Sequence, residues 1–200
     1  MHDGLVRSCN AYFAQLAVRL GTRALAGAAA IAGISYPTTG TPERVRENLP
    51  YSGYGQGRVL ATPLRMARVA AAIGTDGTIR EPSIVMDTKG QVPGFRGAGG
   101  KTFLSEDSAH LLAGYMRDVV TDGTGRLLKN HPFRIAGKTG TAEVDGAKSH
   151  AWFIGFAPAG PASRRIAFAV ILENAGYGGA SAAAVAGQVV TAAASLGLVK

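Results

Sequence analysis

Three consecutive segments in the last third of the chain have the two-residue period of β-strands, and the third is apolar on both faces. The segments cover residues 133–144, 150–157 and 165–173. In the third, Ile166 and Phe168 alternate with Ala167 and Ala169, so neither face is suited to contact with water. A strand of this kind needs cover on both sides. The sequence therefore predicts a sheet that is buried between two layers.

Short turns separate these segments and helical periodicity precedes and follows them, which together predict an α+β fold. Turn residues at Asp145-Gly146 and at 158–161 favour antiparallel hairpins. Helices are expected over 11–33 with a break at Gly21, from Thr62-Pro63 to Gly74, from Ser105 to Asp122, and over 180–196. Irregular connectors are expected over 35–60 and over the glycine-rich residues 87–103. A covering helix is expected over 180–196, with Val185, Val189 and Leu196 on one side.

Composition excludes several classes of function. The formal net charge is +8, yet the basic residues form no block, so nucleic-acid binding is not expected. Cys9 is the only cysteine and the four histidines are scattered, so neither a disulfide framework, a metal site nor a cofactor is expected. No apolar run approaches the roughly 18 residues that span a bilayer, and no membrane span is expected in this chain.

Two short motifs carry chemistry. Ser8-Cys9-Asn10 precedes the first long helix, and Lys138-Thr139-Gly140-Thr141 lies in the first predicted strand. Each has an ordinary explanation when it is taken alone. Ser-x-Asn before a helix is commonly an N-cap, and Lys-Thr-Gly can be a strand end with a solvated lysine. In this order, however, the two motifs match elements of the signature of penicillin-interacting serine acyl-transferases.

With these motifs in place, the chain resembles the C-terminal part of the transpeptidase domain of a class B penicillin-binding protein, and it is most similar to the actinobacterial type. The resemblance covers nearly the whole chain. It also rests on Gly55-Gln56-Gly57 followed by Thr62-Pro63-Leu64, on Asp122-Gly123-Thr124-Gly125, on the residues around Lys138, and on His150-Ala151-Trp152-Phe153. It implies the fold of penicillin-binding transpeptidases and serine β-lactamases, as a single partial domain over 1–200. The helical part would cover about 1–130, and the sheet with the final helix about 131–200.

The resemblance also implies an activity and a set of roles. The activity is peptidoglycan D,D-transpeptidation, with stem peptides ending in D-Ala-D-Ala as substrates and β-lactams as inhibitors. The implied catalytic residues are Ser8, Asn10 and Lys138. Ser8 would pass a proton to the leaving group, and Asn10 would hydrogen-bond the acyl side-chain amide. Lys138 would supply positive charge for the proton relay and for the substrate carboxylate. The implied substrate-binding residues are Thr139, Gly140, Thr141, Gly55, Gln56 and Gly57. Glycines at 137 and 140 would let a substrate backbone run close to the strand.

One required element is missing from the sequence. No serine is followed by a lysine three positions later, so the chain has no Ser-x-x-Lys nucleophile. In the family that element lies N-terminal to Ser-x-Asn, so we expect it outside this chain, and we expect the chain alone to be inactive. The segment 165–173 would then lose a strand neighbour. The resemblance places the parent protein at the extracytoplasmic face of the membrane, anchored by an N-terminal helix that is absent here.

Two hypotheses stay open. In the first, the chain is a part of a larger D,D-transpeptidase whose nucleophile lies in another segment. In the second, it is a non-catalytic remnant that binds peptidoglycan peptide or β-lactam without acylation. A serine β-lactamase ranks lower, because no residue in the sequence marks a deacylation base.

Overall fold

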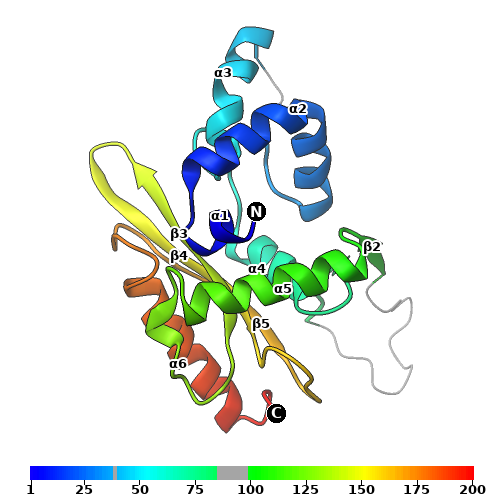
Figure 1. Cartoon of the computed structure of the whole chain (residues 1–200), viewed down its shortest axis with the longest axis vertical. Helices are drawn as coiled ribbons and strands as arrows, with labels where there is room; N and C mark the ends of the chain where they lie inside the picture. Colours follow the sequence, from blue (N-terminus) through cyan, green and yellow to red (C-terminus); the bar gives the residue numbers. More distant parts are fainter. Residues whose placement is uncertain (38–39, 85–98) are drawn as a thin grey trace.

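The computed structural model describes residues 1–37, 40–84 and 99–200 (Figure 1). Its α-helices are α1 (His2–Val6), α2 (Asn10–Ala32), α3 (Pro42–Ser52), α4 (Pro63–Ile73), α5 (Glu106–Thr121) and α6 (Ser181–Ser195), with a 3-10 turn η1 (Arg126–Leu128). Its strands are β1 (Thr78–Arg80), β2 (Gly100–Thr102), β3 (Ala136–Val144), β4 (Ala147–Ala157) and β5 (Ile166–Leu172). The predicted α+β class is confirmed.

The three strands predicted in the last third form one antiparallel sheet in the order β3-β4-β5. Two hairpins make the connections, as the turn residues predict. Lys138 pairs with Ile154 and Thr139 with Phe153, and a β-bulge follows Ala142. Within the described residues, the outer edges of β3 and β5 have no strand partner.

Both faces of this sheet are covered, as the apolar third strand predicts (Figure 1). Phe168 and Val170 face α6 in a cluster that includes the fully buried Phe153. Ala167 and Ala169 pack on the other side, with residues of α4 and α5. The hydrophobic effect therefore holds the sheet between two helical layers.

The side of α6 that carries Val185, Val189 and Leu196 is not the side that the helix buries. Val189 is 36 % exposed and Leu196 is 73 % exposed, and Val185 is only partly buried against the core. The helix instead buries a row of small residues, which are Ala182, Ala183, Ala186, Gly187, Val190 and Ala193. Small side chains let the helix axis approach the sheet closely, so close packing decides which face turns inward.

Three helices begin at N-cap residues, and one of these helices, α3, is not predicted from the sequence. Thr62 and Ser105 accept hydrogen bonds from backbone N–H groups three residues on, as predicted. The prediction of an irregular connector over 35–60 is wrong, because α3 occupies Pro42–Ser52. This helix has the same kind of N-cap: the Thr41 side chain accepts a hydrogen bond from the N–H of Arg44, and Pro42 is the first helical residue. The break at Gly21 is confirmed, since its φ of 78° interrupts α2.

The glycine-rich connector expected over 87–103 lies partly outside the described residues. Its end at Gly100–Thr102 is β2, which pairs antiparallel with β1. This small ribbon contacts α4 and lies apart from the main sheet (Figure 1).

Gly137 is needed for core packing. A Cβ at this position would press into the ring of Phe153, which is fully buried. We expect Gly137→Ala to lower the free energy of unfolding by about 1–3 kcal/mol, since overpacking a dense core costs that much. Gly114→Ala is the control, because a Cβ there meets no atom within 4 Å. It should be neutral or stabilising by up to about 1 kcal/mol. Urea unfolding measures both, and a Gly137→Ala chain as stable as the parent would contradict this packing.

Candidate active site

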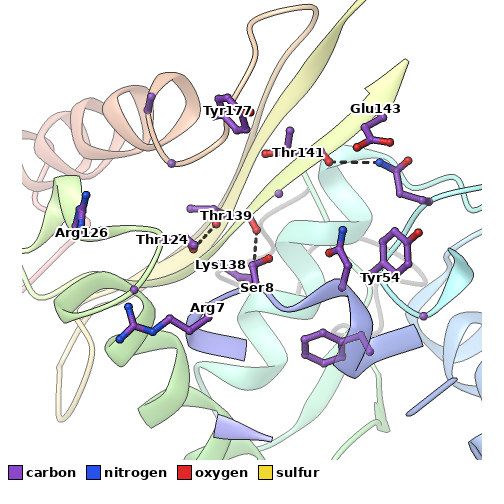
Figure 2. Close-up of a pocket in the computed structure, with 18 residues that line it drawn as sticks. Arg7, Ser8, Tyr54, Thr124, Arg126, Lys138, Thr139, Thr141, Glu143 and Tyr177 are labelled. Atoms are coloured by element: carbon purple, nitrogen blue, oxygen red, sulfur yellow. Dashed lines mark hydrogen bonds between the residues drawn. The ribbon is translucent and has the colours of Figure 1, made fainter. Parts of the chain in front are cut away.

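A cavity of about 780 Å³ lies along the free edge of β3. Four segments far apart in the sequence form its walls together with β3: the α1–α2 junction, the loop after α3, the residues after α5 and the loop before α6 (Figure 2). Both motifs singled out in the sequence therefore face one space.

A hydrogen bond joins the two motifs across 130 residues of sequence. The Nζ of Lys138 donates to the Oγ of Ser8 at 2.7 Å and to the backbone carbonyl of Thr139 at 2.8 Å. The pairing of Lys138 with Ile154, which packs against α4 and α5, puts the lysine on the face from which the α1–α2 junction approaches. The sheet register and the junction together place the two polar groups in contact.

Ser8 is held in an uncommon conformation at this junction. Its φ is 55°, in the left-handed region that few non-glycine residues adopt, and such strain concentrates at functional sites. The N–H of Cys9 donates to the carbonyl of Gly4 at 2.8 Å, and the N–H of Thr124 donates to the carbonyl of Val6 at 3.3 Å. Cys9, not Ser8, is the N-cap residue of α2, and no side chain caps that end. The hydroxyl of Ser8 therefore accepts a hydrogen bond from Lys138 and does not cap α2.

The cavity is electrically positive. Burial lowers the pKa of Lys138 from its ordinary 10.5 to about 8. No carboxylate lies within 4 Å of its Nζ among the described residues. Arg7 and Arg126 also line the space, and Glu143 is the one acidic lining residue in the described part of the chain (Figure 2). A site with this balance favours an anionic ligand and an ammonium that can lose its proton near neutral pH.

The two threonines of the second motif have different environments. Thr139 is 8 % exposed, and its hydroxyl lies 2.6 Å from the hydroxyl of Thr124 (Figure 2). Whichever oxygen accepts this bond keeps its own proton for a ligand. Thr141 is exposed, and its Oγ1 accepts from the N–H of Gly178 at 3.4 Å. Thr124, from the Asp122-Gly123-Thr124-Gly125 segment, is thus a direct partner of the motif.

The other predicted residues come from the start of α2, the loop after α3 and β3 itself. Asn10 and Gln56 line the cavity, and the Gln56 Nε2 lies 3.5 Å from the carbonyl of Thr141. Gly140 also lines it. Gly55 and Gly57 do not; both have a left-handed φ, and they present Gln56 between them.

Among the lining residues that the sequence motifs do not contain, four are arginines or tyrosines. They are Arg7, Tyr54, Arg126 and Tyr177. The described residues contain no group of three or more His, Cys, Asp or Glu side chains that could hold a metal ion. In that same part of the chain, no helix is long and apolar enough to cross a membrane.

The lowered pKa of Lys138 makes stability depend on pH. Between pH 8 and 10.5 the folded chain has lost this proton while the unfolded chain still holds it, so the free energy of unfolding rises with pH. The full difference is about 3 kcal/mol, from about 1.4 kcal/mol per pKa unit. Chemical unfolding from pH 7 to 11 should show this rise in the parent and in Lys148→Met, an exposed lysine on the same sheet, but not in Lys138→Met. Parallel curves for all three chains would contradict the burial of this ammonium.

Comparisons with known proteins place this geometry in a family. Residues 1–191 match the penicillin binding protein transpeptidase domain. The peptidoglycan D,D-transpeptidase PbpA of Mycobacterium tuberculosis is 33% identical over 96% of this chain and 43% of its own length. The peptidoglycan D,D-transpeptidase MrdA of Acinetobacter baumannii is 32% identical over 91% of this chain and 33% of its own length. The chain thus spans less than half of these curated relatives.

Solved structures agree. The imipenem acyl-enzyme complex of penicillin-binding protein A from M. tuberculosis superposes with a TM-score of 0.77 at 28% identity, over 96% of this chain and 46% of that one. The resemblance inferred from the two motifs is confirmed, as is the fold that it implies. On the match over residues 1–191, the chain belongs to the penicillin-binding protein transpeptidase domain family.

Proposed function

We propose that this chain forms the substrate-recognising part of a peptidoglycan D,D-transpeptidase domain, and that the nucleophilic serine comes from another segment. The observation that carries the proposal is the Lys138–Ser8 hydrogen bond inside a positive cavity at a free strand edge. Both D-Ala-D-Ala peptides and β-lactams place a carboxylate near the amide bond that is attacked. The relative with a bound imipenem acyl group supports the same ligand class here.

In this proposal the carboxylate binds between Lys138 and the threonine hydroxyls. The exposed hydroxyl of Thr141 and the Thr124–Thr139 pair supply donors, and the ammonium supplies charge. The peptide backbone then adds along the free edge of β3, where Gly140 leaves room. Asn10 and Gln56 line the same cavity, and Asn10 would hold the acyl side-chain amide. The backbone N–H of Thr141 is the proposed oxyanion donor.

The Lys138–Ser8 pair would act as the proton relay. When the nucleophile has added to the carbonyl and the C–N bond breaks, the leaving amine takes the hydroxyl proton of Ser8. Lys138 returns a proton to Ser8 across the 2.7 Å hydrogen bond. A lysine with a pKa of about 8 is suited to this exchange, because neither of its two forms is strongly disfavoured at neutral pH.

The nucleophile is the part that this chain does not supply. No serine among the 200 residues is followed by a lysine at the third position. We infer a single partial domain over 1–200, completed by a segment that carries Ser-x-x-Lys and working where peptidoglycan is built, at the extracytoplasmic face of the membrane. The missing nucleophile also supports the second candidate, a remnant that binds the same peptides or β-lactams without acylation.

Labelling in the native host separates the two candidates. With an affinity tag after Lys200, the enzyme proposal predicts a product longer than 200 residues that a fluorescent penicillin labels covalently. Ser8→Ala and Lys138→Ala should each slow labelling by at least about 100-fold, the usual size of a lost acid–base group. Lys148→Ala, on the exposed part of β4, should label as the parent does.

An unlabelled product of 200 residues would overturn the enzyme proposal in favour of the remnant. A long product whose labelling is unchanged in the Ser8 and Lys138 variants would overturn the roles given to these two residues.

A further inference from the structure

A second cavity, of about 590 Å³, shares no lining residue with the first. It lies between the C-terminal end of α4, the middle of α5 and the turn that joins β4 to β5. Three arginines line it, Arg117, Arg134 and Arg165, and His110 stands at its wall. Asp118 is the one acidic residue on the lining among the described residues.

Backbone carbonyls fix two of the three guanidinium groups. Arg165 donates its Nε to the carbonyl of Pro158 at 2.9 Å and its two terminal nitrogens to the carbonyls of Gly74 and Gly160. Arg117 donates one terminal nitrogen to the carbonyl of Ile135 at 2.7 Å, which leaves its other donors uncommitted. These bonds hold positive charge at the cavity in a set orientation, without carboxylate partners.

Arg134 is the exposed member of the group. Its side chain makes no hydrogen bond or ion pair within the described residues, although its backbone carbonyl accepts from the N–H of Ala159 at 2.7 Å. All five of its N–H donors are therefore available to a ligand.

Within the described residues, Asp118 is the one lining carboxylate against the three arginines of this cluster. In the described part, no carboxylate lies within 4 Å of any of the three guanidinium groups. The carboxylate of Asp118 already contacts the Nε2 of His2 at 2.9 Å, and this contact raises the pKa of His2. Burial and the nearby charge of Arg134 together lower the pKa of Arg117. An anion in the cavity would relieve this repulsion.

We propose that the second cavity binds a phosphoryl anion, with Arg134 and Arg117 as its direct donors and Arg165 as a fixed neighbouring charge. Guanidinium groups recognise phosphate oxygens through paired hydrogen bonds. A multiply charged anion can also neutralise several neighbouring cations at once. The group can reach the site as a soluble diphosphate or as part of a lipid headgroup, and these two sources share the same recognition chemistry.

Inorganic pyrophosphate is the probe for this site, titrated by calorimetry into the chain at constant ionic strength. The parent should bind one equivalent in a saturable manner. Arg134→Gln should weaken binding by about tenfold or more, the size of one lost charge-assisted hydrogen bond. Arg46→Gln removes the same charge from an exposed position on α3 and should change affinity by less than about twofold. Asp118→Asn should strengthen binding, because it removes the one repelling carboxylate.

Two results would overturn the proposal. One is the absence of saturable pyrophosphate binding by a parent chain whose circular dichroism shows it folded. The other is equal weakening in Arg134→Gln and Arg46→Gln, which would mean that only net charge matters.

Vesicles that contain phosphatidylglycerol distinguish the two sources. Binding of both vesicles and pyrophosphate, with both sensitive to Arg134→Gln, supports a lipid headgroup in this cavity. Binding of pyrophosphate alone supports a soluble anion. Binding of vesicles alone would overturn the proposal, because a diffuse basic surface explains it without a cavity.

Discussion

Burial of both faces of the three-stranded sheet is the constraint on which the rest of the structure depends. The fully buried Phe153 of β4 packs under α6, and on the other side Ile154 and Phe156 pack toward α4 and α5. Because neither face can be exposed, the strand register cannot slip by one residue without turning every side chain to the wrong layer. The same register fixes Lys138 on the side where Ser8 approaches. The site geometry is therefore a consequence of core packing.

Two features of the site oppose folding, and the proposed ligand recognition would account for them. A buried ammonium without a carboxylate partner opposes folding below its pKa, as does a serine held at a φ of 55°. Both features are arranged around a cavity that an anionic ligand would neutralise. A chain selected for stability alone would place a neutral side chain at 138. The proposed function explains why the fold keeps a destabilising lysine at this position.

Much of the fold follows from local rules that the sequence displays. The alternation in 165–173, the caps at Thr62 and Ser105, and the break at Gly21 each depend on neighbouring residues, and each is confirmed. The helix α3 was missed because its prolines suggested a loop, although Thr41-Pro42 carries a start signal.

Features that depend on tertiary packing could not be predicted. The face of α6 is decided by how closely Ala186 and its neighbours approach the sheet, not by which residues are most apolar. In the site, both motifs were found, but the Thr124–Thr139 contact needs the whole fold.

The most direct test of the central claim is intact-mass spectrometry of the folded 200-residue chain after incubation with benzylpenicillin, beside a complete class B penicillin-binding protein as positive control. No covalent adduct on this chain is expected, because the nucleophile is proposed to come from another segment. A stoichiometric adduct would show that one of its own serines is the nucleophile, and it would contradict a site that depends on another segment.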